Sequence, residues 1–294
     1  MLTTKTGSSL LLLLTAIIWG FAFVAQRKGM EFTGPFTFNA ARFLLGGMVL
    51  IPLIFKQNTE FFTKFHKHQS IKGGLFAGVL LFCGASLQQI GIIYTTAGNA
   101  GFITGFYVVL VPIFGFFFFH KTTINVWIGA ILALIGMYFL SVSYNFEISK
   151  GDLLVLMGAF VWAFHVLVIG KYAPIANVII IAVIQFFVCG LLSLIVAVFT
   201  EPIEMNGIIN AGIPILYGGI LSVGLAFTLQ VVVQKYAHPS VTAIILSTEA
   251  IFAALGGWLI LGESLTSRGI FGCILMLAGM LAAQINFNFK RQKV

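Results

Sequence analysis

Apolar residues form long runs along the chain, and charged or turn-forming residues gather in the short stretches between these runs. A run of about 20 apolar residues is long enough for a helix to cross about 30 Å of hydrocarbon. Ten runs have about this length, so we predict ten membrane-spanning helices. They lie at residues 9–26, 35–55, 72–93, 97–119, 124–143, 152–170, 176–199, 209–234, 239–261 and 268–287.

The composition also favours a membrane protein. Of the 294 residues, 60% are hydrophobic and only 8% are charged, and the mean hydropathy is +1.07. Soluble domains carry about 25% charged residues. The longest connection between the runs, residues 57–70, leaves no room for a soluble catalytic domain. The predicted fold class is therefore an all-α integral membrane protein.

The first apolar run follows Lys5 and resembles a secretory signal in its position. It is longer and more aromatic than the apolar core of a typical signal, and it lacks a convincing A-x-A cleavage site. We therefore predict that it is an uncleaved span.

The cysteine spacing gives no sign of a disulfide or a metal site. Cys83, Cys189 and Cys273 stand singly in apolar runs, without a C-x-x-C pattern. We interpret them as small packing residues. We expect no metal and no cofactor.

Basic residues are distributed unequally between the two sides of the predicted bundle. Eleven lie on the side that holds both termini, whereas Arg27, Lys28, Lys150 and Arg268 lie on the other side with most of the acids. Because cytoplasmic loops carry an excess of Lys and Arg, we predict cytoplasmic termini in a protein of the cell inner membrane. The net charge of +8 then reflects topology and contact with membrane lipid, and no nucleic acid partner is expected. The eleven residues are Lys5, Lys56, Lys64, Lys67, Lys72, Lys121, Lys171, Lys235, Lys290, Arg291 and Lys293.

The chain repeats itself at an offset of 142 or 143 residues. Residues 11–30 align with residues 153–173, and residues 86–100 align with residues 228–242. The fifth and tenth spans give a third match, and three matches that agree to one residue make chance alignment a poor explanation. The paired residues include Ala16 with Ala159, Trp19 with Trp162, Phe21 with Phe164, Gln88 with Gln230, Tyr94 with Tyr236, Gly129 with Gly272, Gly136 with Gly279 and Met137 with Met280.

The repeat divides the chain into two halves, residues 1–148 and 149–294. Each half has five predicted spans, and because five is odd, the second half must enter the bilayer from the opposite face. Lys28 and its counterpart Lys171 lie on opposite sides of the predicted bundle, as this inversion requires. Inverted repeats are typical of secondary transporters, in which the substrate site lies near the midplane between the halves.

Three stretches of the sequence carry a family resemblance. They are W-G-F at 19–21, QQIGIIYTTAGNAGFITGFYVVLVP at 88–112 and ILSTEAIFAALGGWLILGESLTSRGIFG at 245–272. With ten spans arranged as five plus five, the chain resembles the drug/metabolite transporter superfamily, specifically its EamA group. The resemblance implies a carrier of small organic solutes, in a group whose members export amino acids or other metabolites, or take up vitamins or cofactors.

The chain departs from the family pattern at two places. Many members have Glu-Pro where this chain has Glu249 followed by alanine, which puts a proline kink there in doubt. The second half keeps the family's Gly262-Glu263, but the first half has Phe119-His120 at the corresponding place. One copy of that acid is therefore missing.

Polar residues inside the predicted spans are candidates for a solute site, because such residues usually face the bundle interior or a wet cavity. Glu249 lies about ten residues into the ninth span, close to the midplane at about 1.5 Å per residue. Its repeat counterpart is Tyr107. Amides, aromatic walls and one acid on a shared cavity would suit a zwitterionic or aromatic solute. Further candidates at comparable depth are Trp19, Gln88, Gln89, Trp162, His165 and Gln185.

These candidates also have structural interpretations. Glu249 is either a substrate or proton-coupling group, or a protonated packing carboxyl that bonds to Ser247, Thr248 or a neighbouring backbone. His165 is either a proton relay or a satisfied interior histidine. The tyrosine and the two tryptophans are compatible with cavity lining and with plain packing.

Arg42 lies about seven residues inside the outer end of the second span. One interpretation is a snorkelling side chain that anchors this end to lipid head groups. The other is a gate or an anion contact at the external mouth.

The favoured function is a secondary active transporter that moves a small amino acid-like, aromatic or zwitterionic metabolite by alternating access. No nucleotide-binding motif accompanies the spans, so a gradient must supply the energy, and a proton carried by Glu249 or His165 is the favoured coupling ion. We expect an exporter. The alternatives are an uptake carrier or exchanger for a vitamin or nucleotide-like cofactor, and a lipid-carrier flippase of the same superfamily.

An enzyme and a channel are disfavoured. Intramembrane enzymes need paired aspartates, H-E-x-x-H or a histidine with an acid at depth, and Glu249 with His165 is the one acid–base pair available. A channel filter needs a ring of like residues, which the halves do not carry. The expected partners are a small-molecule solute, protons and membrane lipid, and the expected state is a monomer or a weak homodimer.

Overall fold

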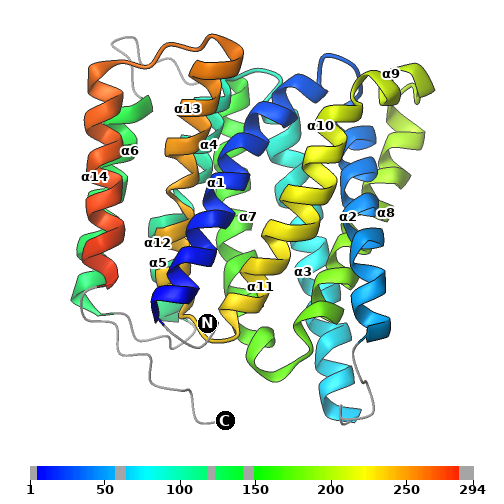
Figure 1. The fold of residues 1–294 in the computed structure, drawn as a ribbon, viewed down its shortest axis with the longest axis horizontal. Coiled ribbons are helices and arrows are strands. Elements are labelled where there is room, and N and C mark those ends of the chain that lie inside the picture. Colours follow the sequence, from blue (N-terminus) through cyan, green and yellow to red (C-terminus); the bar gives the residue numbers. More distant parts are fainter. Residues whose placement is uncertain (1–4, 57–63, 118–122, 142–148, 285–294) are drawn as a thin grey trace.

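Helices make up the described part of the chain, which comprises residues 5–56, 64–117, 123–141 and 149–284 of the computed structural model. No strand occurs within these residues, so the all-α prediction is confirmed. Figure 1 shows the helices side by side in one bundle, with the first and last described residues, 5 and 284, at the same end. We call this end the termini end and the opposite one the far end.

The helices agree with the predicted spans. Eight segments are long and apolar enough to cross a membrane, and two shorter apolar helices, Ile124–Phe139 and Ser267–Ala283, complete the set. The largest difference is in α3, which begins at Lys64 and not at residue 72, because a helix can continue into polar sequence beyond the hydrocarbon. The segments are α1 (Lys5–Gly29), α2 (Pro35–Lys56), α3 (Lys64–Gly91), α4 (Ala97–Thr104), α5 (Tyr107–Phe117), α6 (Ile124–Ser141), α7 (Lys150–Tyr172), η2 (Ala173–Ile175), α8 (Val178–Thr200), α9 (Met205–Asn210), α10 (Gly212–Leu216), η3 (Tyr217–Phe227), α11 (Thr228–Gln234), α12 (Pro239–Leu246), α13 (Glu249–Leu261) and α14 (Ser267–Gln284).

Two predicted spans are broken near their middles. The fourth consists of α4 and α5, separated at residues 105–106, and the ninth consists of α12 and α13, separated at residues 247–248. At the second break, the hydroxyls of Ser247 and Thr248 donate to carbonyls of the preceding turn at 2.9 and 2.7 Å, and such bonds compete with the helical pattern. At the first break lies Gly105, and glycine is a weak helix former. Both predicted spans are confirmed, but each consists of two helices and not of one continuous helix.

The eighth span is continuous but is not an α-helix throughout. Between α10 and α11, the residues of η3 form wide π-helical turns. Such turns are rare and are frequently found at functional sites. Nothing in the sequence predicted this stretch, because its apolar pattern is also that of an α-helix.

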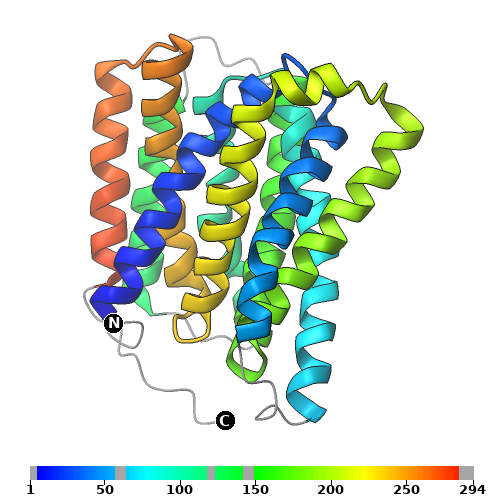
Figure 2. The same cartoon turned by 45° about the vertical axis from the view of Figure 1, so that its right-hand side comes forward.

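The two halves pack together as inverted copies. From Lys5 to Gly29, α1 runs from the termini end to the far end, whereas its counterpart α7 runs the opposite way (Figures 1 and 2). Three elements pack against their own counterparts, namely α2 against α8, α6 against α14, and α4–α5 against α12–α13. This arrangement brings the two broken spans into contact.

Glycines between α6 and α14 show the symmetry directly. A Cβ atom on Gly129 would lie 2.7 Å from the carbonyl oxygen of Gly279. A Cβ atom on Gly136 would lie 2.5 Å from the carbonyl oxygen of Gly272. Since these four glycines are counterparts in the repeat, the two contacts are related by an approximate two-fold axis.

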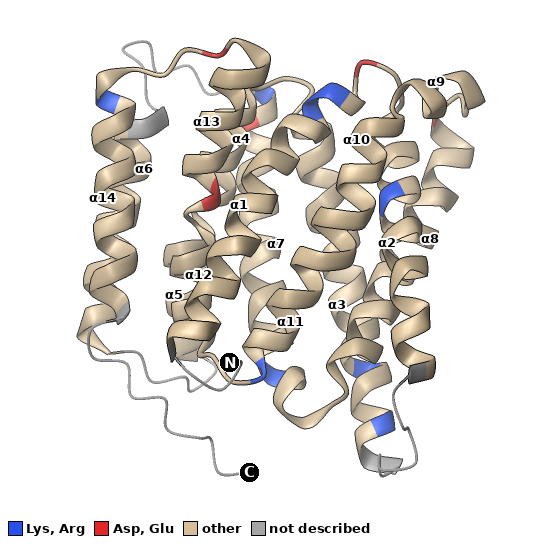
Figure 3. Cartoon of the chain, in the orientation of Figure 1, with Lys and Arg blue, Asp and Glu red and all other residues tan. Residues whose placement is uncertain are grey.

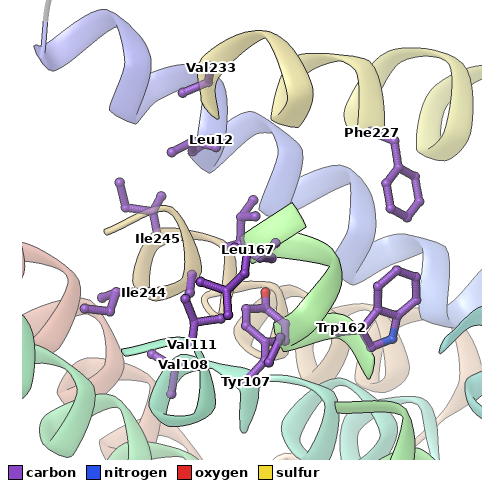
Figure 4. Close-up of a cluster of buried hydrophobic side chains, with 14 of the residues drawn as sticks. Leu12, Tyr107, Val108, Val111, Trp162, Leu167, Phe227, Val233, Ile244 and Ile245 are labelled. Atoms are coloured by element: carbon purple, nitrogen blue, oxygen red, sulfur yellow. The ribbon is translucent and has the colours of Figure 1, made fainter. Parts of the chain in front are cut away.

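A cluster of apolar side chains lies in the interior on the termini side of the breaks. Buried side chains of α1, α5, α7, α11 and α12 form one cluster there (Figure 4). We give the name apolar plug to five of its members, each at most 6% exposed. They are Leu12, Val108, Leu167, Val233 and Ile244.

Carboxylates link the two halves at the far end. Glu201, just after α8, accepts hydrogen bonds from the backbone N–H groups of residues 36 and 37, both at 2.8 Å, at the start of α2. Glu263, just after α13, accepts bonds from the backbone N–H groups of residues 97 and 98 at 2.8 and 3.0 Å, at the start of α4. Each carboxylate therefore caps a helix of the other half.

A third acid and two glycines complete these contacts, which we call the far-end clasps. Asp152, at the start of α7, accepts a hydrogen bond from the hydroxyl of Thr95 at 2.6 Å. Each of the two glutamates also fits against a glycine, Gly34 or Gly257, whose Cβ atom would overlap the carboxylate.

Charged residues lie mainly at the two ends of the bundle (Figure 3). Two charged residues lie deeper, Arg42 on α2 and Glu249 on α13. At the termini end the described charged side chains are basic, whereas the far end holds both signs. The described acids of the far end are Glu31, Asp152, Glu201, Glu204 and Glu263.

Candidate functional site

A cavity lies between the two halves at the level of the breaks. Residues on both sides of each break line it. Six of the nine predicted site residues lie on its wall. They are Trp19, Arg42, Gln88, Tyr107, Trp162 and Glu249.

The first residues after the two breaks are bonded to each other. The Tyr107 hydroxyl donates to Oε1 of Glu249 at 3.0 Å, and each residue is 3% exposed. Ser247 and Thr248, the alternative partners expected from the sequence, direct their hydroxyls to backbone carbonyls instead. No other described residue donates to the Glu249 carboxyl. The repeat counterparts thus meet at the two-fold axis and join the halves at the cavity.

The W-G-F motif brings α1 against this break. Trp19 lines the cavity, and a Cβ atom on Gly20 would lie 2.7 Å from the backbone carbonyl oxygen of Glu249. Only a residue without a side chain allows this approach. The motif therefore sets the distance between α1 and α13.

A chain of hydrogen bonds runs along another part of the wall. The Trp162 Nε1–H donates to Oε1 of Gln88 at 3.0 Å, and Nε2 of Gln88 donates to Oε1 of Gln26 at 2.9 Å. Three helices, α7, α3 and α1, contribute one residue each. Gln89 does not line the cavity, because its amide donates to the backbone carbonyl of Gln26 at 3.3 Å.

Phe227 lies at the centre of the aromatic part of the wall. Its ring centroid is 4.4 Å from that of Trp19 and 5.9 Å from that of Trp162. The Trp19 Nε1–H donates to the carbonyl oxygen of Ser222 at 3.2 Å, within the π-helical stretch η3. The wide turns of η3 thus supply both a ring and a backbone acceptor to the site.

His165 and Gln185 form a pair behind this wall and do not line the cavity. His165 Nε2 lies 2.9 Å from Oε1 of Gln185, and both residues are 0% exposed. The imidazole packs edge-on against Trp162 and Phe227, with centroids 5.8 and 6.1 Å apart. Access to a solute would therefore require movement of an aromatic ring.

Arg42 does not snorkel to the far end. It is 3% exposed and lines the cavity. Its Nε–H donates to Oδ1 of Asn39 at 2.9 Å, and its guanidinium lies 4.7 Å from the centroid of the Phe43 ring. The interpretation as a lipid anchor is wrong, because interior partners hold the side chain.

Several lining residues were not predicted. Gln26 lies seven residues after Trp19 and four after Ala22 on one face of α1, so helical periodicity could have found it. Gln230 is the repeat counterpart of Gln88, so the repeat could have found it. Thr104 and Phe227 gave no such signal. Phe227 is one of 31 phenylalanines, and only packing distinguishes it.

The comparison with known families decides the identity. The sequence model described as the EamA-like transporter family matches residues 7–142 and again residues 149–283. This chain belongs to the EamA-like transporter family. The resemblance expected from the sequence is thereby confirmed.

Relatives of this EamA-family protein are also named as transporters. An uncharacterized transporter of Archaeoglobus fulgidus is 34% identical over 279 residues, which cover 93% of this chain and 84% of the relative. The uncharacterized transporter YoaV of Bacillus subtilis is 21% identical, over 95% of this chain and 96% of its own length. A solved crystal structure superimposes with a TM-score of 0.76 over 95% of this chain and 97% of its own, at 17% identity, which supports the fold.

The two departures of this EamA-family chain from the family pattern now have structural outcomes. The break before Glu249 forms without the proline, because the two hydroxyls before it supply the local bonds. Gly262 has a φ of 70° and ends α13, which turns Glu263 towards α4. Phe119-His120, the corresponding stretch of the first half, lies outside the described residues.

Within the described residues, no group of three His, Cys, Asp or Glu side chains is placed to hold a metal. The three cysteines are free thiols. The polar and aromatic lining of the cavity in this EamA-family protein consists mainly of aromatic rings, side-chain amides, one carboxyl group and one guanidinium.

Proposed function

We propose that this protein is a secondary active transporter that moves a small organic metabolite through the central cavity by alternating access. The bond between Tyr107 and Glu249 carries the proposal, because it joins the inverted halves where two spans are broken. Broken helices at the midplane supply solute and ion sites in many secondary transporters. Movement of one half against the other would separate this pair and open the carboxyl to solute.

The lining favours an amino acid-like, aromatic or zwitterionic solute. Trp19, Trp162 and Phe227 offer ring faces on one side of the cavity. Gln26 and Gln88 offer amide groups, and Glu249 would attract an ammonium group. Aromatic rings add cation–π attraction to such a group.

Glu249 is also the proposed carrier of a coupling proton. It is the one acid among the lining residues, whereas His165 lies behind the aromatic wall. A carboxyl that exchanges a phenol partner for solute or water can bind and release a proton at different stages of the cycle. We propose export as the direction, since amino acid exporters are among the members that the resemblance implies.

The proposed orientation places the termini end in the cytoplasm and the far end outside the cell inner membrane. The described basic residues at the termini end face no described acid there, as expected for the cytoplasmic side (Figure 3). A Glu204→Cys variant should react with a membrane-impermeant maleimide added outside intact cells. Reaction only after the membrane is opened would reverse the orientation.

Uptake into proteoliposomes tests the transport proposal. We expect at least one labelled amino acid to enter from a panel of amino acids and vitamins, and to enter faster under an imposed pH gradient. Glu249→Gln should abolish the effect of the gradient, because an amide cannot carry the proton. Glu204→Gln, which removes an exposed acid with no side-chain hydrogen bond at the helix start, is the matched control.

Two results would contradict parts of the proposal. Unchanged transport and gradient dependence in Glu249→Gln would remove both roles of this residue. Transport of vitamins alone would replace the amino acid-like solute by the cofactor class.

A further inference from the structure

Arg42 is a buried cation that no described carboxylate neutralises. The side chain is 3% exposed, lines the cavity, and is charged at every physiological pH. Within residues 5–56, 64–117, 123–141 and 149–284, the ion pair that occurs joins Lys28 and Glu31. A buried guanidinium without a partner is costly in a membrane. Its position on a cavity wall is suited to a ligand that supplies the missing charge.

The surroundings of Arg42 hold the guanidinium and leave its outer edge available. Asn39, itself 0% exposed, accepts the Nε–H bond at 2.9 Å and donates to the carbonyl oxygen of Ala85 on α3 at 3.2 Å. The rings of Phe43 and Phe38 flank the guanidinium, with centroids 4.7 and 5.6 Å from Cζ. These contacts use one N–H of the group and place two aromatic rings near it. No described residue accepts from the two Nη atoms.

The two charged residues of the cavity are each bonded to a neutral partner. Arg42 is bonded to Asn39, and Glu249 is bonded to Tyr107. Arg42 lies on α2 and Glu249 on α13, and no ion pair joins them. The cavity therefore has separate positive and negative positions.

We infer that Arg42, oriented by Asn39, is the binding site for a carboxylate group of the transported solute. The two Nη groups of a guanidinium match the two oxygens of a planar carboxylate, and the resulting bonds are charge-assisted and directional. A guanidinium already fixed by neighbouring groups loses little freedom when it binds. Asn39 is a positioning residue, since it acts through Arg42.

The inference rests on the proposed function in one respect, that the cavity is the solute site. Binding can nevertheless be measured without transport. We choose benzoate as the probe and benzamide as its uncharged counterpart of similar shape. Both are titrated into the purified full chain in detergent, and binding is followed by calorimetry.

The wild-type protein should bind benzoate on the order of tenfold or more tightly than benzamide. Arg42→Gln should abolish this preference while benzamide binding persists, which also shows that the variant is folded. Arg42→Lys should keep only part of the preference, because lysine retains the charge but lacks the two parallel N–H donors of the guanidinium. Asn39→Ala should reduce the preference without removing it. Lys28→Gln, which removes an exposed charge near the far end, should leave it unchanged.

Three outcomes would overturn the inference. They are an absence of benzoate binding to the wild-type protein, equal preference for benzoate in Arg42→Gln, and stronger competition by inorganic phosphate than by acetate. Arg42-dependent benzoate binding by a protein that transports nothing from the panel would refute the proposed function alone. Amino acid transport that is unaffected by Arg42→Gln would refute this inference alone.

Discussion

The two halves contact each other differently on the two sides of the cavity. Towards the termini end lies the apolar plug, in which aliphatic side chains from five helices fill the interior (Figure 4). Towards the far end lie the clasps, in which three carboxylates of the second half bond to the first half. The polar contact described between the halves at the termini end is a neutral one, from the Asn177 backbone N–H to the Ser70 hydroxyl at 2.9 Å.

The difference between apolar packing and hydrogen-bonded carboxylates affects how the halves can separate on each side. Apolar packing depends on many weak contacts spread over an area, so it is lost gradually as side chains move apart. A charge-assisted hydrogen bond is directional and is lost within a short displacement. Because every clasp crosses between the halves, a movement that separates the halves at the far end breaks all three. We therefore expect substitutions in the plug to alter mainly stability, and substitutions in the clasps to alter also which side of the cavity is accessible.

The largest effect should come from the plug. Ile244→Ala removes apolar atoms at a position that is 0% exposed, and we expect a loss of about 3 kcal/mol in the free energy of unfolding. Denaturant unfolding of the purified protein in detergent measures it. Ile213→Ala, at a position that is 83% exposed, should change by less than about 0.5 kcal/mol. Equal losses of stability in both variants would show that the plug contributes no more to stability than an exposed position does.

Removal of the Glu201 carboxylate should have the next largest effect. Glu201→Ala deletes the acceptor for two backbone N–H groups and for the Thr37 hydroxyl, and we expect a loss of about 2 kcal/mol. A Ser222→Cys probe in the cavity wall, in a chain without the native cysteines, should react faster with a maleimide added at the far end. Glu204→Ala is the control, and an equal rate in both variants would contradict the role of the clasp.

Glu263→Gln should cost less, about 1 kcal/mol, because one amide oxygen still accepts. Gly257→Ala should reproduce the effect, since the added methyl group displaces the same carboxylate. A double-mutant cycle measures the coupling between the two positions. Additive losses in the double variant would mean that the glycine does not act through Glu263.

The smallest effect belongs to the neutral contact at the termini end. Ser70→Ala removes the acceptor for the Asn177 N–H, and we expect a loss of about 0.5 kcal/mol. The far-end reactivity of the Ser222→Cys probe should not change. An increase as large as that produced by Glu201→Ala would show that the two ends are not distinct.

The sequence predicted the features that follow from the lengths of the apolar runs and from the internal repeat. Apolar run length predicted the spans, and the repeat offset predicted that Tyr107 and Glu249 are counterparts, which the structure finds bonded. Residues facing the axis from matching positions, such as Trp19 and Trp162, were found for the same reason.

Features that depend on local competition or on neighbours could not be predicted. Hydroxyl side chains and glycine occur in intact membrane helices as well as at breaks, so residues 105–106 and 247–248 carried no decisive signal. Helical spacing places Asn39 beside Arg42, but it does not show that α3 and the cavity lie against this face of α2. The same limit applies to Phe227, whose position results from the π-helical turns.

The bond between Tyr107 and Glu249 requires that the two halves differ in sequence, as two repeats of one polypeptide can. In a homodimer of a single repeat, a two-fold axis places identical side chains at equivalent positions. Two carboxyls at the axis would repel each other when ionised, and two phenols would provide no acid. Fusion of the repeats allows one half to supply the donor and the other the acceptor. The backbone remains approximately symmetric, whereas the two side chains that meet at its axis are different.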